Sequence, residues 1–197
     1  MRYNNYHRHD HYSNIRTPDV IVKPEDYIKR AKELGHTTYF TTNHGCSGNV
    51  FEAYELCKKN NLKCIYGMEM YYVDDRFVKD NRNNYHIVVI GLTKNAYYEI
   101  NRISSEANNT GFYYHPRVDL ELLLSLPKDE VVITTACIAG RLFKTPDYIN
   151  EFVIPLKEHF GKNFMLEVQN HNHPSQANWN KKVLNLSQEY DIPIIHG

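Results

Sequence analysis

The sequence predicts an α/β fold in which strands and helices alternate around a parallel sheet, open or closed. Three observations lead to this prediction. Short, almost wholly apolar runs cover residues 86–92 and 131–136, as in strands that are buried on both faces. Segments with apolar residues at helical spacing separate such runs, for example residues 96–107. The alternation gives seven expected strands and contains no internal repeat.

Local composition explains where the expected elements begin and end. Pro24 suits the first turn of a helix, and Gly35 ends that helix. Residues 37–42 are mostly β-branched or aromatic and predict a strand, whereas the charged, Asn-rich residues 74–84 predict an exposed excursion. The other expected strands cover residues 62–66, 86–92, 131–136, 164–169 and 193–195, with extended structure at 70–73, and the other helices cover residues 50–59, 96–107, 118–126, 146–159 and 175–189.

The composition fits one soluble globular domain. The chain has 197 residues, of which 42% are hydrophobic, and 23 basic residues balance 23 acidic ones. A formal charge of zero gives no overall electrostatic case for nucleic-acid binding, so contact with DNA must be local or come from another domain. The four cysteines form no CxxC pair, and no apolar run reaches the ~20 residues of a membrane helix or resembles a signal peptide. We therefore expect a cytoplasmic protein that has no membrane partner.

The His-rich stretch at residues 6–13 is the first candidate for chemistry. His7, His9 and His11 occupy alternate positions, so an extended strand would place all three on one side. Imidazole is the commonest metal ligand among side chains, and two rings from one strand form a chelating pair. The alternative is a polar strand that faces solvent, or the remnant of a purification tag, although a tag would be a homopolymeric run.

Other ligand-type residues gather at the ends of the expected strands. His44, Glu69, Cys137 and His171 each lie just beyond the carboxyl end of a strand, whereas His86 opens one. That edge of the sheet is where barrel and doubly wound enzymes build their sites. Side chains that merely cap strands or meet solvent would not favour one edge so consistently. The pattern therefore indicates a site for several metal ions.

These motifs, in this order, resemble the polymerase-and-histidinol-phosphatase (PHP) domain. HRH at residues 7–9 with YS at 12–13 resembles its HxH(S/T)xYS opening, TNHG at 42–45 its TDHG motif, GME at 67–69 its GxE motif and HIVV at 86–89 its HLVLL strand. Three further stretches resemble one branch, the N-terminal domain of bacterial DNA polymerase III alpha subunits: GFYYHPRVD at 111–119, ACIAG at 136–140 and LEVQNH at 166–171. An insertion at residues 14–17 is similar to the form in phage-encoded relatives.

The resemblance implies a distorted (β/α)7 barrel that holds up to three divalent metal ions in a cleft at the strand ends. Carried over position by position, it implies seven ligands: His7, His9, Asp19, His44, Glu69, His86 and Cys137. The last two ligands of the family belong to an NDxH motif that should begin where this chain ends, at His196-Gly197. We therefore expect residues 1–197 to be a single PHP domain, the N-terminal fragment of a longer polymerase chain.

Three further residues are candidates for supporting roles. Asn43 stands where the family usually has Asp, and an amide raises the basicity of a neighbouring histidine less than a carboxylate does. His11 and His171 match no ligand, and we expect them to support a ligand, to contact substrate or to be solvated. The sequence assigns no catalytic residue.

The implied chemistry is metal-dependent hydrolysis. Mixed His, carboxylate and Cys ligands suit Zn, with Mn or Fe at the more oxygen-rich positions. Closely spaced divalent ions supply hydroxide near neutral pH and bind a phosphate between them, so the resemblance implies cleavage of a phosphodiester. In relatives with a complete ligand set this resembles a 3′–5′ exonuclease, with DNA and the other polymerase domains as partners.

Two alternatives to an exonuclease remain open from the sequence. One is a stand-alone phosphatase of the histidinol-phosphate type, and the other is a structural module whose metals only brace the polymerase. Because two of the family's ligands are missing, we expect little exonuclease activity from these 197 residues alone.

Overall fold

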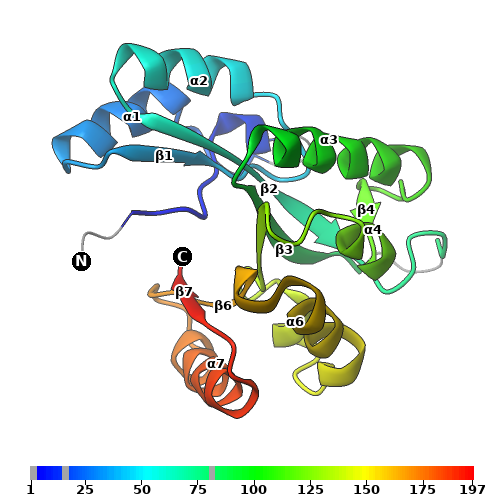
Figure 1. The fold of residues 1–197 in the computed structure, drawn as a ribbon. Helices are drawn as coiled ribbons and strands as arrows, with labels where there is room; N and C mark the ends of the chain where they lie inside the picture. Colours follow the sequence, from blue (N-terminus) through cyan, green and yellow to red (C-terminus); the bar gives the residue numbers. More distant parts are fainter. Residues whose placement is uncertain (1–3, 15–17, 80–82) are drawn as a thin grey trace.

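The computed structural model describes residues 4–14, 18–79 and 83–197, which form a mixed α/β fold (Figure 1). Residues 15–17 of the implied insertion and residues 80–82 of the expected excursion lie outside the described residues. The strands are β1 Thr38–Thr41, β2 Lys63–Tyr72, β3 Tyr85–Gly91, β4 Arg117–Val118, β5 Val131–Thr134, β6 Phe164–Val168 and β7 Ile194–His196. The helices are α1 Pro24–Glu33, α2 Val50–Lys59, α3 Lys94–Asn109, α4 Leu120–Leu124, α5 Arg141–Lys144, α6 Ile154–Phe160 and α7 Gln176–Tyr190, with short turns η1 His11–Ser13, η2 Ile149–Val153 and η3 Gly161–Asn163.

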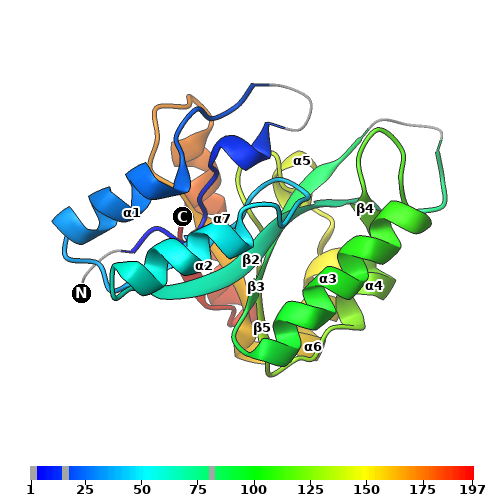
Figure 2. The ribbon, with the colours of Figure 1, turned by 90° about the horizontal axis from the view of Figure 1, so that it is seen from above.

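The strands form one curled sheet in the order β1-β2-β3-β5-β6-β7, and β4 pairs with the end of β2. Among the described residues no pairing joins β1 to β7, so the sheet is a half-barrel. In Figure 1, α1, α2 and α3 lie on one side of the curl and α6 and α7 on the other. Figure 2 shows α2 lying along β2, with α3 beside it. The helices thus cover the outside of the curl, and Ile100 and Ile103 of α3 are fully buried in the core.

Strand β3 runs against its neighbours, so the expected wholly parallel sheet is wrong. It is antiparallel to β2 and to β5, whereas the pairs β1–β2, β5–β6 and β6–β7 are parallel. The chain from β2 to β3 passes through the excursion after Tyr72 rather than through a crossover helix, and parallel neighbours need such a crossover. The amino end of β3 therefore lies at the same edge as the carboxyl ends of the other strands.

The N-terminal His-rich segment is not a strand in the described residues. Its backbone bonds to side chains instead of a ladder: the N–H of Arg8 donates to Thr42 Oγ1 at 2.6 Å, and that of Asp10 to Asn43 Oδ1 at 2.8 Å. His11 then begins the turn η1, where the Asp10 carboxylate accepts from the Tyr12 N–H. The regular alternation that would have aligned three histidines ends at this turn.

Two expected helices are shorter than the sequence indicates. The helix expected at 118–126 is reduced to α4, and its start is set by Asp119, which caps it by accepting from Leu122 N–H at 3.2 Å. The helix expected at 146–159 begins as the π-helical turn η2 and becomes regular only in α6, where Pro155 stands in the first turn.

Over the described residues, no helix is both long and apolar enough to cross a membrane.

Gly67 lies in a crowded part of the sheet and provides a test of its packing. A β-carbon at this position would lie 2.8 Å from the carbonyl oxygen of Val89 and 3.2 Å from that of Thr41, and neither backbone atom can move freely. We expect Gly67→Ala to lower the free energy of unfolding by about 1–3 kcal/mol in urea titrations of the metal-free protein. Gly91→Ala is the matched control, because its nearest contacts are side-chain atoms at 3.3 and 3.4 Å. A loss at Gly91 as large as that at Gly67 would contradict this explanation.

Candidate metal centre

The candidate site lies at the edge where β1, β2 and β5 run out and β3 begins. His44 follows β1, and an isolated bridge pairs it with Glu69, which lies within β2 because that strand continues to Tyr72. His86 is the second residue of β3, so the reversed direction of β3 explains how a histidine at the start of a strand reaches this edge. The N-terminal segment contributes His7 and His9 from the inner side of the curl.

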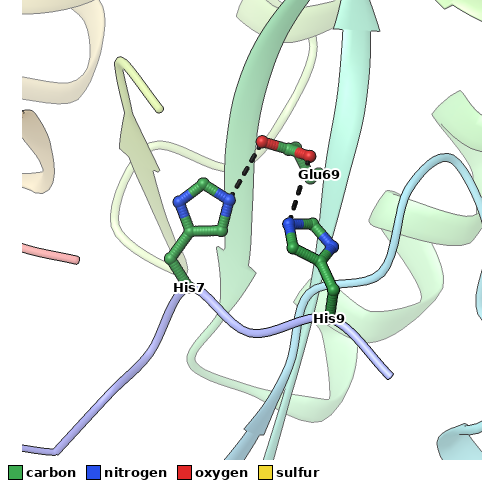
Figure 3. Close-up of side chains that lie close together, drawn as sticks. All are labelled: His7, His9 and Glu69. Carbon is green, nitrogen blue, oxygen red and sulfur yellow. Dashed lines mark hydrogen bonds and ion pairs between the residues drawn. The ribbon is translucent and has the colours of Figure 1, made fainter. Parts of the chain in front are cut away.

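The buried carboxylate of Glu69 is the centre of the site. Its Oε1 lies 2.9 Å from Nε2 of His7 and 3.1 Å from Nδ1 of His86. Its Oε2 lies 2.6 Å from Nδ1 of His44 and 3.5 Å from Nε2 of His9. Figure 3 shows His7 and His9 pointing at the two oxygens from the same segment. Four imidazoles from three parts of the chain thus converge on one carboxylate.

Three overlapping groups of these side chains have the spacing of metal ligands. In each group, one ligand atom per residue lies within 4.8 Å of the others, and the groups are His7, His9 and Glu69; His9, Asp19 and His44; and His44, Glu69 and His86. Asp19 joins through its Oδ2, which lies 3.5 Å from Nε2 of His44. Because neighbouring groups share members, the arrangement could hold several closely spaced ions.

Two of the donor atoms in the site lack hydrogen-bond partners, and a metal ion would satisfy them. Nδ1 of His44 and Oε2 of Glu69 are both buried and lie 2.6 Å apart, yet neither atom has a hydrogen-bond partner. A buried polar atom without a partner costs free energy, and a shared cation would satisfy both atoms. Imidazole nitrogens with carboxylate oxygens are a common donor set for Zn and related divalent metals. The residues therefore fit the metal ions that the sequence implies.

In the absence of metal, the cluster is held together by ion pairs between protonated histidines and buried carboxylates. Burial alone would raise the pKa of Glu69, but the rings of His7 and His86 hold it well below its usual range. Burial would lower the pKa of His86, but the Glu69 carboxylate and, after it, Cys137 outweigh burial and raise this pKa to about 10. The pKa of His7 is also raised, because Glu167 and Glu69 outweigh the effect of burial. The pKa of His9 is lowered to about 4 by burial and by the neighbouring rings of His44 and His7. Because a ligand histidine must be neutral, metal binding would release protons here.

Cys137 lies beside this cluster and not within it. Its Sγ lies 3.7 Å from Nδ1 of His86 and accepts from the N–H of Ala139 at 3.4 Å. No three-residue group in the described part of the chain includes it. Of the seven sequence-implied ligands, the structure thus brings six into the groups and leaves Cys137 in contact with one of them.

The three supporting candidates lie at different distances from the cluster. Asn43 exchanges hydrogen bonds with Asp10 and accepts one from Ser13 Oγ at 2.8 Å, and Ser13 in turn lies 3.2 Å from Nδ1 of His9. Its amide thus orders the loop that carries His9, and its hydrogen bonds do not go to the neighbouring His44 ring. His11 packs its ring on Tyr12 at 4.5 Å, away from Glu69.

His171, the third candidate, is exposed on the loop after β6. Its Nε2 lies 3.1 Å from Oε1 of Gln169. Neither His11 nor His171 is in any of the three ligand groups formed by the described residues.

Sequence reasoning missed Glu167, a buried carboxylate 2.7 Å from Nδ1 of His7. It lies in β6, whose other residues are apolar. A charged residue within an otherwise apolar strand is seldom buried unless it is paired, and this was the available signal.

Comparison with known proteins agrees with this geometry. The family model of the PHP domain matches residues 5–171. The chain belongs to the PHP domain family. This PHP domain is similar to the DNA polymerase III alpha subunit of Aquifex aeolicus, at 29% identity over 208 residues. It is also similar to that of Borreliella burgdorferi, at 29% identity over 204 residues. The matches cover 96% and 98% of this chain but 17% of each relative, so the chain spans about a sixth of their length.

Two solved structures share the fold of this PHP domain at low sequence identity. A protein from Bifidobacterium adolescentis, assigned as a metal-dependent phosphoesterase, matches with a TM-score of 0.58 and 16% identity over 97% of this chain and 85% of its own. An amidohydrolase from Chromobacterium violaceum matches with a TM-score of 0.59 and 14% identity over 97% and 84%. With the curled sheet, these matches confirm the predicted α/β class of distorted barrel.

The central place of Glu69 predicts unequal effects of two conservative substitutions. Glu69 is shared by two ligand groups, whereas Cys137 belongs to none of the groups that the described residues form and lies beside one candidate ligand, His86, so Glu69→Gln removes charge from two positions at once. We expect Glu69→Gln to lower the metal content of the purified protein more than Cys137→Ser does, as measured by elemental analysis after dialysis. Equal losses, or a larger loss for Cys137→Ser, would count against a bridging role for Glu69.

The pKa of His86 predicts how the metal-free protein responds to pH. Folding raises this pKa from 6.5 to about 10, so the stabilisation is complete below about 6.5 and is lost as the pH rises towards 10. We expect the thermal midpoint measured with a chelator to fall across this range, and His86→Gln to flatten the dependence. His159→Gln, remote from the site, is the control and should retain the slope. A wild-type midpoint that does not change with pH would contradict the pairing of His86 with Glu69.

Proposed function

We propose that this PHP domain is a metal-dependent phosphoesterase that acts as part of a DNA polymerase III alpha-type replicative polymerase. The observation that carries the proposal is the convergence of four imidazoles on the buried carboxylate of Glu69. A carboxylate that is 1% exposed needs compensating positive charge, and the donor atoms around it have the spacing of metal ligands. The relatives that cover nearly the whole chain are polymerase subunits.

Each side chain has a role in this proposal. His7 and His9 bind from the N-terminal segment, His44 and Asp19 from the side of β1, and His86 from β3, with Cys137 next to it. Glu69 lies between the groups and joins them. Bound divalent ions, with Zn or Mn favoured by the donor set, would supply a nucleophile near neutral pH and neutralise the charge of a phosphate.

The proposed substrate is a phosphodiester, in particular the 3′ end of a DNA strand. Support comes from the relatives, since a site next to a polymerase meets DNA ends in the course of synthesis. The formal charge of the chain is zero, so DNA would be held largely by other polymerase domains, its proposed partners in cis. Such a polymerase acts in the cytoplasm.

Metal binding is the first test. We expect the 197-residue chain, dialysed against Zn²⁺ or Mn²⁺ and then against buffer, to retain at least one ion per chain in elemental analysis. His9→Ala should lower this content, because His9 belongs to two of the ligand groups. His159→Ala, which changes a histidine of α6 far from Glu69, should not. A metal-free wild type that His9→Ala leaves unchanged would refute the proposed site.

Hydrolysis is the second test, and it also separates the proposal from its alternatives. The substrates are single-stranded DNA labelled at its 3′ end and p-nitrophenyl phosphate, each with Mn²⁺ or Zn²⁺. The full product of the gene and the 197-residue chain are assayed side by side. Metal-dependent release of 3′ nucleotides, lost in Glu69→Gln, is the expected result. Release of phosphate from the monoester alone would indicate a phosphatase. Bound metal without either reaction would indicate a structural module.

A further inference from the structure

Glu167 is the second buried carboxylate at the metal centre, and all of its acceptor positions are filled by protein donors. Its Oε1 lies 2.7 Å from Nδ1 of His7 and accepts from Nε2 of Gln169 at 2.7 Å. Its Oε2 accepts from Oγ1 of Thr134 at 3.0 Å and from the hydroxyl of Tyr6. The side chain is fully buried. A carboxylate has about four lone-pair positions, so four donors leave none for a metal ion.

These contacts decide which nitrogen of His7 carries a proton. The Glu167 carboxylate already accepts hydrogen bonds from Gln169, Thr134 and Tyr6, so it acts as an acceptor towards His7 as well. Nδ1 of His7 must therefore be the donor. Nε2 points to the opposite side, where Oε1 of Glu69 lies 2.9 Å away. Once a metal ion replaces the proton on Nε2, the lone pair of that nitrogen faces the site.

We propose that Glu167 is a positioning residue that fixes the ring of His7 and its Nδ1–H form, so that Nε2 is presented to the metal. This inference rests on the proposed metal site. A carboxylate that accepts the second N–H of a ligand histidine orients the ring and raises its basicity. His7 needs this support because its segment pairs with no strand among the described residues.

The loop after β6 extends this support to the surface. Oε1 of Gln169 lies 3.1 Å from Nε2 of His171, and Nε2 of Gln169 donates to Glu167. An amide whose oxygen is occupied by His171 turns its NH₂ group towards Glu167. The alternate residues of the LEVQNH stretch thus form one chain of contacts that ends at His7.

The test compares Glu167→Gln with Glu158→Gln, an exposed glutamate of α6. Affinity for Zn²⁺ is measured by competition with a chromophoric chelator, and the His7 ring of the zinc-loaded protein is observed by ¹⁵N NMR. We expect Glu167→Gln to weaken zinc binding by about 10- to 100-fold and to reduce the Nδ1–H signal of His7. Glu158→Gln should change neither. The NMR signal reports the ring itself, which a general loss of packing at Glu167 would not alter selectively.

Zinc affinity of Glu167→Gln within twofold of wild type would overturn the inference. If that variant fails to fold, Tyr6→Phe keeps the carboxylate and removes one of its donors, and it should weaken binding severalfold; unchanged affinity there would equally overturn it. If Glu167→Gln binds zinc as tightly as wild type while His9→Ala loses metal, Glu167 has no positioning role and the proposed function still stands. A wild type that binds no zinc would refute the proposed function itself.

Discussion

A carboxylate locked into the middle of a sheet is the constraint on which this structure depends. Both backbone polar groups of Glu69 are bound to the segment that follows β1, since its N–H donates to Asn43 O at 3.1 Å and its carbonyl accepts from Gly45 N–H at 2.8 Å. The side chain cannot turn to solvent from this position and is 1% exposed. Removing a charge from water costs several kcal/mol unless partners compensate it. The histidines that surround it are therefore a requirement of the fold as well as candidate metal ligands.

The direction of β3 serves the same constraint. A parallel β3 would place His86 at the opposite edge of the sheet, about 20 Å from the carboxyl ends of its neighbours for a strand of seven residues. The antiparallel return places His86 opposite Tyr71, two residues beyond Glu69 on the adjacent strand. Residues two apart on a strand face the same side, so His86 and Glu69 share the inner face.

The sequence allowed prediction of the parts of the site that depend on local order. Because β1, β2 and β5 run in the same direction, residues near their carboxyl ends reach one edge, and His44, Glu69 and Cys137 could be assigned to that edge without knowing the strand order. The sequence did not allow prediction of features that depend on contacts between distant parts of the chain. Side chains of Thr42 and Asn43 replace a strand ladder around Arg8 and Asp10. Three of the four partners of Glu167 come from positions 6, 7 and 134, which no local pattern connects.

The N-terminal segment links folding to metal binding, because its place is fixed mainly by the groups of the site. Tyr6 bonds to Glu167, His7 lies between Glu167 and Glu69, and the backbone of Arg8 is tied to Thr42 rather than to a strand. Without a metal ion, the ring of His7 must stay protonated to satisfy two carboxylates at once, and its raised pKa expresses this. A metal ion would take over the charge at Nε2, while Nδ1 keeps its bond to Glu167. In the proposed site, proton and metal would therefore be alternative occupants of one position, and either one would hold the segment against the sheet.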